Sequence, residues 1–346
     1  MSSTLFLQLP IATASDLRPR GEPATCHTKS GKRRYTAYND WIKQRHGGRV
    51  QKVSVNAGFT CPNRDGTLGV GGCSFCNNDS FTPSYLLEQS SITEQLATGL
   101  EFLRRRYPRT RAFLAYFQSY SNPYGERDRL LACYETALAH PGIDGLVIGT
   151  RPDCLADAIL DDLAEIARRT IVELEIGIES CDDAVLAACH RGHDFACTQD
   201  TIRRAAARGL FVTGHLLLGL PGETPAGRIA GAEALATLPL DALKFHQLQI
   251  VRGTRLANQW RQDPASVPLL SPAASIDAVI DMLERLPPTV KIQRLGSEVP
   301  PAHRLSPDWG RLSVFPALLE TRLRERDTWQ GRLVSRHGTD SGDPQR

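Results

Sequence analysis

The stretch that decides the fold runs from Asn56 to Phe81 and reads NAGFTCPNRDGTLGVGGCSFCNNDSF. It contains three of the nine cysteines of the chain, Cys61, Cys73 and Cys76, in a C-x11-C-x2-C spacing. The two-residue gap predicts a tight turn on which Cys73 and Cys76 lie together, so that both sulfurs reach one metal centre. Three thiolates suit soft metals, either zinc or the iron of an iron–sulfur cluster.

The number of ligands separates two kinds of metal site. Structural zinc sites usually close with a fourth Cys or His, and [4Fe–4S] clusters usually take four cysteines. The next cysteine here is Cys133, which does not continue the spacing. Three cysteines leave one iron open, which favours catalysis over a structural role, and the alternative is a loop with incidental thiols. Glycines supply a backbone free to wrap an ion: Gly66, Gly69, Gly71 and Gly72.

Composition narrows the class of protein. Among 346 residues, 41% are hydrophobic and 23% are charged, which is typical of a globular chain. No apolar run of about 18 residues predicts a spanning helix, and residues 4–14 lack the basic segment that begins a secretory signal. Nine irregularly spaced cysteines without such a signal indicate free thiols in a reducing compartment. We therefore expect a cytoplasmic protein that does not contact membranes.

The net charge of +3 is spread unevenly. Residues 17–52 hold ten Lys and Arg against only Glu22 and Asp40, and a second basic cluster extends from Arg104 to Arg111. Two interpretations stay open. The clusters form a footprint for phosphates, or they are solvated faces that flank secondary structure.

Strand and helix patterns alternate through the middle of the chain. Residues 1–30 predict a flexible leader, and residues 31–252 hold six strand–helix units. Because parallel strands need helical crossovers, this alternation predicts an α/β fold, a partial (β/α)6 TIM-like barrel. In such barrels the chemistry lies at the carboxyl ends of the strands, and the cysteine stretch directly follows the first strand. The expected strands cover 51–56, 112–118, 145–150, 171–178, 211–218 and 242–250.

The pattern changes after residue 252. Prolines punctuate residues 253–335, where we expect helices over 254–261, 274–285 and 309–326 and a short strand over 290–294. This segment predicts a C-terminal extension packed on the barrel and covering its open side. Residues 336–346 are polar and predict a flexible tail.

Two sets of residues carry a family resemblance. Three close cysteines with Phe75 before the last one resemble the cluster loop of radical S-adenosylmethionine (SAM) enzymes. Five further segments make the chain similar to the YhcC-type family of bacterial radical SAM proteins, a relative of the elongator catalytic subunit. The likeness extends over about residues 34–333. The segments are GTRPD (149–153), HRGHDFAC (190–197), GLPGE (219–223), IVRGT (250–254) and ERDTWQG (325–331).

The resemblance implies two cofactors and a reaction type. Cys61, Cys73 and Cys76 would hold a [4Fe–4S] cluster whose open iron takes SAM, and reductive cleavage would give a 5′-deoxyadenosyl radical. Phe75 belongs to the same loop and is implied in cofactor binding. An electron donor of flavodoxin or ferredoxin type is implied as a partner. The family supplies no reaction that fixes the substrate.

The resemblance also assigns SAM contacts to the strand ends. Gln118 and Ser119 would lie beside the methionyl amine, and Glu179 would bind the ribose. Arg191 would clamp the SAM carboxylate, or else cap or pair with Asp194.

His215 has two interpretations, as a ribose-contacting residue or as a satisfied core histidine. Lys244 and His246 lie on one face of their strand, from which they would reach substrate.

The third and fourth strands raise separate questions. Gly149 stands where the elongator family has an acid, which removes one polar cofactor contact. Arg151 would face the substrate or form a structural ion pair with Asp153. A period of two places Glu173, Glu175, Gly177 and Glu179 on one strand face, and buried acids favour a ligand because they are costly unless paired.

Two hypotheses of different class follow. The first is a radical SAM enzyme of unknown substrate, with RNA, including tRNA, as a candidate because of the elongator relation and the basic clusters. The second is a non-catalytic RNA-binding or scaffold protein with a structural metal. The second requires a fourth ligand close to the other three, and the candidates are Cys154, Cys181, Cys189 and Cys197.

Overall fold

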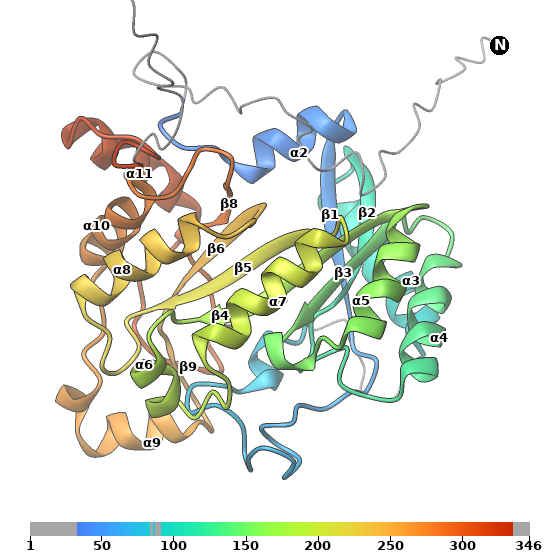
Figure 1. The fold of residues 1–346 in the computed structure, drawn as a ribbon, viewed down its shortest axis with the longest axis horizontal. Helices are drawn as coiled ribbons and strands as arrows, with labels where there is room; N and C mark the ends of the chain where they lie inside the picture. Colours follow the sequence, from blue (N-terminus) through green and yellow to red (C-terminus); the bar gives the residue numbers. More distant parts are fainter. Residues whose placement is uncertain (1–32, 84–85, 87–90, 335–346) are drawn as a thin grey trace, which may run out of the picture.

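A curled sheet of seven parallel strands forms the centre of the molecule (Figure 1). The computed structural model describes residues 33–83, 86 and 91–334, so the leader and the tail expected from the sequence lie outside the described residues. The order of the strands is β1-β2-β3-β4-β5-β6-β8. The sheet therefore confirms the expected partial barrel. Its strands are β1 (Arg49–Val55), β2 (Thr110–Phe117), β3 (Gly145–Thr150), β4 (Ile171–Glu179), β5 (Phe211–Leu218), β6 (Ala242–Gln247) and β8 (Lys291–Arg294).

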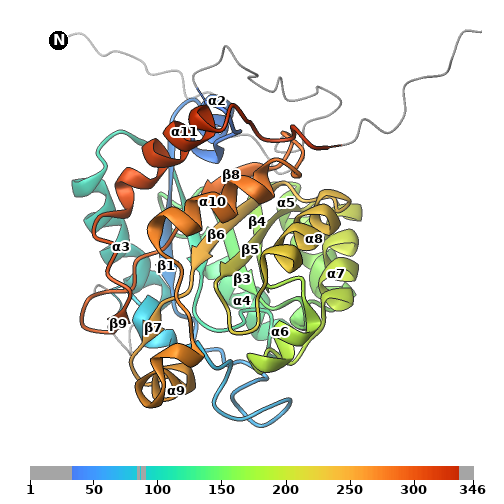
Figure 2. The same cartoon turned by 90° about the vertical axis from the view of Figure 1, so that its left-hand side faces the viewer.

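Helices connect consecutive strands and cover the outer face of the sheet (Figures 1 and 2). Each crossover between parallel strands carries at least one of them. They are α3 (Ile92–Arg106), α4 (Arg127–Leu138), α5 (Asp157–Ala167), α6 (Asp183–Ala188), α7 (Phe195–Ala207), α8 (Pro225–Ala236), α9 (Arg255–Gln262) and α10 (Pro272–Leu283). Short 3-10 turns cover Asn78–Phe81, Pro152–Cys154, Pro264–Ser266 and Leu312–Val314.

Two further helices lie near the amino ends of the strands. One is α2 (Tyr38–His46), and the other is α11 (Phe315–Glu325), which packs beside α10 (Figure 2). Trp41 of α2 stacks on Phe211 at the start of β5, with ring centroids 5.3 Å apart. None of the helices in the described ranges is long and apolar enough to cross a membrane.

Helix α3 shows how local sequence fixes an element. The Ser91 side chain accepts a hydrogen bond from the Glu94 backbone N–H, and the Glu94 carboxylate accepts one from Ser91 N–H, which is a complete capping box. Apolar residues at helical spacing form a stripe along α3, which is buried at Leu96, Leu100 and Leu103. Capping and stripe together position the helix against β1 and β2.

The C-terminal segment contributes to the sheet more directly than the sequence indicates. The expected sixth strand stops at Gln247, and the residues after it form β7 (Ile250–Val251), which pairs with β9 (Arg304–Ser306) in a separate antiparallel ribbon. The strand expected in the extension is β8, and it pairs with β6 in parallel. Helix α10 therefore serves as one more crossover, and the main sheet continues past residue 252.

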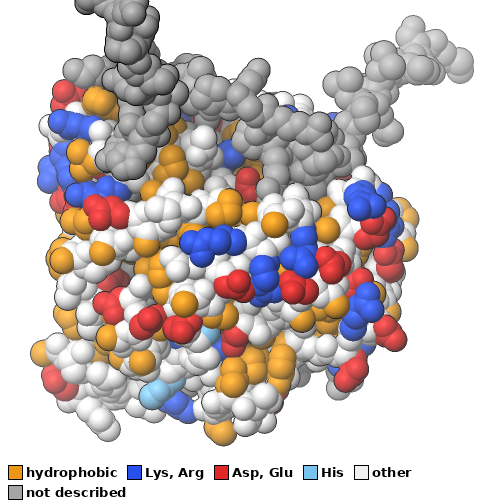
Figure 3. Space-filling view, viewed as in Figure 1, with side chains coloured by type: hydrophobic (Ala, Val, Ile, Leu, Met, Phe, Trp, Pro, Cys, Tyr) orange, Lys and Arg blue, Asp and Glu red, His pale blue; other side chains and the backbone are white. Residues whose placement is uncertain are grey.

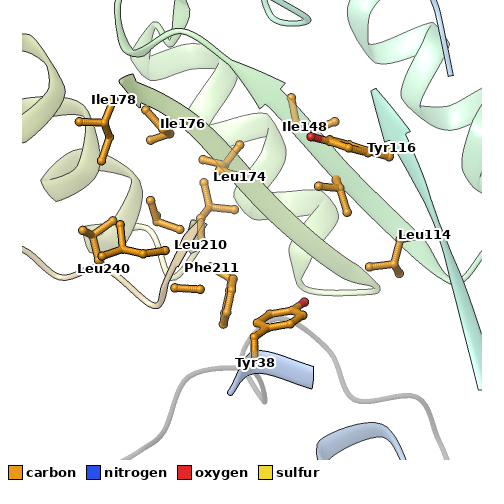
Figure 4. Close-up of a cluster of buried hydrophobic side chains, with 14 of the residues drawn as sticks. Tyr38, Leu114, Tyr116, Ile148, Leu174, Ile176, Ile178, Leu210, Phe211 and Leu240 are labelled. Carbon is orange, nitrogen blue, oxygen red and sulfur yellow. The ribbon is translucent and has the colours of Figure 1, made fainter. Parts of the chain in front are cut away.

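The core lies between the sheet and its outer helices. Figure 4 shows part of it, in which Leu174, Ile176 and Ile178 of β4 meet residues of the neighbouring strands. Between β2 and the outer helix α4, Phe117 and Tyr134 pack edge to face with ring centroids 5.1 Å apart. Both side chains are almost completely buried.

Tyr134 allows a test of this packing. Its hydroxyl is buried and has no hydrogen-bond partner among the described residues, so Tyr134→Phe is expected to leave the free energy of unfolding unchanged or raise it by up to about 1 kcal/mol. Tyr134→Ala removes the ring and is expected to cost about 3–5 kcal/mol. Urea unfolding of both variants checks the pair. A loss above about 2 kcal/mol for Tyr134→Phe would show that the hydroxyl is satisfied.

Candidate metal centre and barrel interior

The cysteine loop lies at the carboxyl edge of the sheet, directly after β1 (Figure 1). Three elements that are distant in sequence hold it there. Ser121 N–H, after β2, donates to Thr60 O, and Ser74 N–H donates to Cys189 O at the end of α6. Leu256 N–H, in the first turn of α9, donates to Ser74 O. The loop is thus fixed to the edge where the sequence places the chemistry.

Inside the loop the backbone follows the expected turns. Cys76 N–H donates to Cys73 O over 3.1 Å, which forms the predicted tight turn. Positive φ angles occur at Gly66, Gly71 and Gly72, while Gly69 does not need one. A Cβ on Gly72 would come within 2.8 Å of Arg64 Nη1, so the loop also needs glycine for close packing.

The three thiols influence one another electrostatically. Burial, together with the charges of Cys73 and Cys61, raises the pKa of Cys76 to about 12. Burial also raises the pKa of Cys61, and Cys73 again adds to the shift. The three thiols therefore lie close enough for the charge of one to shift the pKa of another. Within the described ranges, no three His, Cys, Asp or Glu side chains are spaced to hold a single metal ion.

Cationic side chains lie near the three thiols of the loop. Arg64 and Arg191 act on the Cys76 thiol, and Arg151 and Arg191 act on Cys61, in each case lowering its pKa against the effect of burial. Arg64 Nη1 is buried and has no hydrogen-bond partner in the described part of the chain. An anionic group among the thiols would satisfy that nitrogen. Three thiolates and this cationic shell fit an iron–sulfur cluster, which is anionic when bound by thiolates.

Cys73 also receives two hydrogen bonds. Arg191 Nη1 donates to Cys73 Sγ over 3.6 Å, and Asn63 Nδ2 donates to the same sulfur over 3.5 Å. Asn63 Nδ2 also contacts His190 O, which ties the loop to the segment after α6. Asn63 was not among the residues predicted for the site. Its place two positions after Cys61 is the sequence feature from which a polar contact to the site could have been predicted.

The end of β4 brings Glu179 and Arg191 together. Glu179 has a φ of 65°, and the pairing with β5 is irregular between Gly177 and Glu179. Arg191 Nη2 donates to Gly177 O over 2.7 Å and lies 3.5 Å from Glu179 Oε1. A Cβ on Gly177 would lie 2.5 Å from Arg191 Nη2, so only glycine leaves room for the guanidinium. Burial raises the pKa of Glu179, and Arg191 opposes that shift.

The structure bears on the alternative roles predicted for Arg151 and Arg191. Arg151 forms a bidentate ion pair with Asp153, at 2.9 and 2.6 Å, so the structural ion pair is confirmed. Asp194 accepts a hydrogen bond from Cys197 N–H and caps α7. Arg191 is therefore bound by Cys73, Gly177 and Glu179, and the alternative pairing with Asp194 is wrong.

The ends of β2 and β3 approach each other closely. Ser119 is buried, and Gln118 is half-buried beside it. A Cβ on Gly149 would lie 3.1 Å from Phe117 O and 3.5 Å from Gln118 Cα. The acid found here in the elongator family would therefore displace the end of β2. The roles of Gln118 and Ser119 in SAM binding stay predictions.

Phe75 lies in a small apolar cluster and not in open space. It packs with Val185, Cys189, Leu220 and Leu248, residues from α6 and from the loops after β5 and β6. The aromatic ring thus connects the cysteine turn to the neighbouring strand ends. Its contribution to cofactor binding stays a prediction.

A buried network of charges fills the middle of the sheet's concave side. Glu175 accepts hydrogen bonds from Lys52 at 2.6 Å, from Lys244 at 2.5 Å, from His215 at 3.0 Å and from Tyr116. Burial opposes ionisation, but Lys244, Lys52 and His215 hold the pKa of Glu175 well below its usual value. The carboxylate is thus satisfied by protein groups without a ligand.

Glu173 belongs to the same network. It pairs with Lys52 at 2.8 Å and accepts a hydrogen bond from Tyr38 of α2. Buried acids on β4 are thus explained by internal cations, which corrects the expectation that Glu173 and Glu175 indicate a ligand. Lys52 and Tyr116 were not among the residues predicted for the site. A lysine within the otherwise partly apolar strand RVQKVSV could have indicated a cation that pairs with the buried acids.

His215 and His246 lie side by side in this network, with ring centroids 5.3 Å apart. Burial lowers the pKa of His215 to about 4, and Lys244 lowers it further. Burial also lowers the pKa of His246 well below its usual value. The His246 Nε2 atom is buried without a partner among the described residues. His215 is therefore hydrogen-bonded inside the barrel, as its core interpretation predicts, while a ribose contact stays untested.

Lys244 is the least satisfied cation of the network. Burial lowers its pKa to about 7; Glu175 raises the pKa, and Lys52 and Arg294 lower it. Burial likewise opposes the charge on Lys52, but Glu173 and Glu175 raise the pKa of Lys52 above its usual value. Two lysines thus share Glu175, and Lys52 holds its proton more strongly.

The cysteines proposed as a fourth ligand occupy different places. Cys189 is buried, and its pKa is raised to about 11 by burial and also by Cys73. Burial raises the pKa of Cys154 to about 12, with Cys61 contributing. Cys154 and Cys197 line a surface cavity of about 1020 Å³ beside the loop. Cys181 packs on the main core. All eight cysteines within the described ranges are free thiols.

The second basic cluster lies at the far edge of the sheet. Helix α3 ends at Arg106 just before β2 begins, and β1 and β2 are parallel, so the cluster lies at the amino edge. Arg49 and Arg106 lie over the Tyr107 ring, with the guanidinium carbons 4.9 and 5.6 Å from its centroid. On the face seen in Figure 3, basic side chains alternate with acidic ones. Arg105 is exposed and forms an ion pair with Glu101 of the same helix, which agrees with the solvated-face interpretation. The phosphate-footprint interpretation stays a prediction.

Comparison with known proteins places these features in a family. The model of the radical SAM superfamily matches residues 58–232, and that of the radical SAM C-terminal domain matches residues 240–325. Protein YhcC of Escherichia coli K12 is 38% identical over 269 residues, 78% of this chain and 85% of that protein. The tRNA uridine(34) acetyltransferase of Dehalococcoides mccartyi is 28% identical over 45% of this chain and 34% of its own length.

A solved structure agrees at the level of the fold. Elp3 from the archaeon Methanocaldococcus infernus, with residues 1–46 deleted, superposes with a TM-score of 0.59 at 17% identity. The match covers 81% of this chain and 64% of that one. The cysteine loop, the curled parallel sheet and the family matches lead to one conclusion: the chain belongs to the radical SAM superfamily, as an enzyme of the YhcC type related to the catalytic subunit of Elongator.

Proposed function

We propose that Cys61, Cys73 and Cys76 bind a [4Fe–4S] cluster and that the enzyme cleaves SAM reductively. The proposal is supported by the mutual electrostatic influence of the three thiols and by the arginines near them, one of which, Arg64, has a buried nitrogen without a partner among the described residues. When bound and reduced, the cluster supplies the electron that converts SAM to methionine and a 5′-deoxyadenosyl radical. The cofactors carry the hard chemistry, and the protein orients them.

The strand ends would orient SAM around the loop. Gln118 and Ser119 lie at the end of β2 and Glu179 at the end of β4, so they flank the loop on two sides. Glu179 would accept hydrogen bonds from ribose hydroxyls, since its carboxylate meets Arg191 at only one long contact of 3.5 Å. Arg191 donates one hydrogen bond from each of its three nitrogens, and the remaining N–H groups of Nη1 and Nη2 would contact the SAM carboxylate.

The concave side of the sheet would receive the substrate. Lys244 and the unpartnered His246 Nε2 face it from β6, and the Glu175 network fixes their positions. These groups would exclude bulk water and recognise a polar substrate. The interior beneath the cluster is thus already structured before substrate arrives.

RNA is the substrate class that we propose. The support is the relative named for a tRNA uridine and the relation to Elongator. An RNA would reach the loop across the carboxyl edge, where the exposed Arg129 and Arg252 flank it. The reductant would be a flavodoxin- or ferredoxin-like protein in the cytoplasm, where thiols stay reduced.

Cluster binding is tested by single substitutions. Cys61→Ala, Cys73→Ala and Cys76→Ala are each expected to abolish the [4Fe–4S] cluster, because two thiolates do not hold the cube. Cys133→Ala, on the outer helix α4, is the matched control and keeps it. Iron and sulfide analysis with the visible absorption spectrum after anaerobic reconstitution measures both. A full cluster spectrum in any of the three variants would refute the ligand assignment.

SAM cleavage is tested by product analysis. Reconstituted enzyme with dithionite and SAM is expected to release 5′-deoxyadenosine, and the Cys73→Ala protein is expected to release none. Addition of cellular RNA is expected to accelerate release if RNA is the substrate. Reconstituted wild type that forms no 5′-deoxyadenosine under any of these conditions would contradict the proposed reaction.

The structural-metal alternative rests on Cys189 and Cys154, which lie within electrostatic reach of Cys73 and Cys61. A closed site would need one of them as a fourth ligand. Cys189→Ser and Cys154→Ser are therefore expected to leave cluster content unchanged if the fourth corner is open to SAM. Loss of metal in either variant, with zinc and no sulfide in wild type, would favour the alternative.

The ionisation of Lys244 has a measurable consequence. Because the folded pKa of about 7 lies below the unfolded value of 10.5, the unfolded chain binds more protons between these pH values, and stability rises with pH there. The free energy of unfolding of wild type minus that of Lys244→Met is expected to rise by about 1.4 kcal/mol per pH unit from about pH 7.5 to 9.5. Urea unfolding measures it. Lys43 is exposed, so the free energy of unfolding of Lys43→Met is expected to change with pH in parallel with that of wild type. If the curve of Lys244→Met is also parallel to that of wild type, the lowered pKa of Lys244 is disproved.

A further inference from the structure

Arg191 has contacts that SAM binding does not explain. Its Nη1 donates to Cys73 Sγ over 3.6 Å, next to a second donor, Asn63 Nδ2, at 3.5 Å. Arg191, Asn63 and Cys73 are all less than 9% exposed. The two N–H···S bonds therefore lie in a medium of low dielectric, where they are stronger than in water.

The other two nitrogens of the Arg191 guanidinium also form hydrogen bonds. Nη2 donates to Gly177 O over 2.7 Å, and Nε donates to His193 Nε2 over 2.9 Å. Burial opposes its charge, but Cys73 and Glu179 raise the pKa of Arg191 above its usual value. Arg191 is thus a permanent cation with a fixed direction toward one sulfur.

We propose that Arg191 is a positioning residue that raises the reduction potential of the cluster through Cys73, which rests on the proposed function of the loop. Reduction adds one electron to the cluster and leaves its ligands in place. A cation at hydrogen-bond distance from a ligand sulfur stabilises the added charge. Cluster potentials depend on net charge and on hydrogen bonds to the sulfurs, and outer contacts of this kind tune metal sites generally.

Glu179 acts in the opposite direction. Its carboxylate lies 3.5 Å from Arg191 Nη2 and partly cancels the positive field at Cys73. Removing the Glu179 charge therefore raises the potential, while removing the Arg191 charge lowers it. Two neighbouring substitutions with opposite signs separate this role from a general loss of packing.

The experiment is a redox titration of reconstituted protein without SAM, followed by electron paramagnetic resonance of the reduced cluster. For Arg191→Met, we expect the equilibrium for reduction to become about tenfold less favourable, which is about 59 mV for one electron. For Glu179→Gln, we expect a shift of opposite sign. Arg255→Gln is the matched control, because Arg255 is exposed and bonds Val70 O in the same loop. Its midpoint should equal that of wild type.

The outcomes distinguish the two levels of the proposal. Wild type that takes up no cluster refutes the proposed function. Wild type and Arg191→Met with equal cluster content and equal midpoints refute only the role of Arg191. If Arg191→Met does not hold a full cluster, Arg191→Lys and Glu179→Gln carry the test, with midpoints expected below and above wild type. Shifts of the same sign in those two variants overturn the proposal.

Discussion

Parallel pairing of the strands is the constraint on which the rest of the structure depends. When all strands run in one direction, every carboxyl end lies on the same edge. The loop after β1, the irregular end of β4 and the start of α9 therefore meet, although they lie at residues 56–81, 177–179 and 255–256 of the sequence. Backbone hydrogen bonds from Ser121, Ser74 and Leu256 then fix the loop in that position.

The second constraint is the compensation of buried charges inside the barrel. Two carboxylates on β4 are compensated by lysines on β1 and β6, so no charge is left without a partner in the middle of the network. The interior is thus polar, and its side chains hold one another by ion pairs and hydrogen bonds. Protein groups hold one another in place, and the unpartnered edge of His246 and the weakly protonated Lys244 mark the side that stays available.

Local patterns predicted the elements, and long-range pairing decided the details. The six strands, the α3 stripe and the tight cysteine turn follow from periodicity and spacing, which act over a few residues. The strand β8 was also predicted, but its place in the main sheet was not, because that place depends on pairing with β6. For the site, cysteines and strand-end acids were visible as residue types. The partner of Arg191 was not, since Cys73 lies 118 positions away and only the folded edge brings them together.

The pairing register of β4 determines both the position of its two buried acids and the space for Arg191. Its alternate residues carry Glu173 and Glu175 into the barrel, and the same alternation ends at Gly177, which makes room for Arg191. Side chains on a strand change face with every residue. Insertion or deletion of one residue in β4 would expose both acids to the outer apolar layer and move the guanidinium away from its sulfur at once. Evolution of this strand is therefore restricted to exchanges of side chains at constant length.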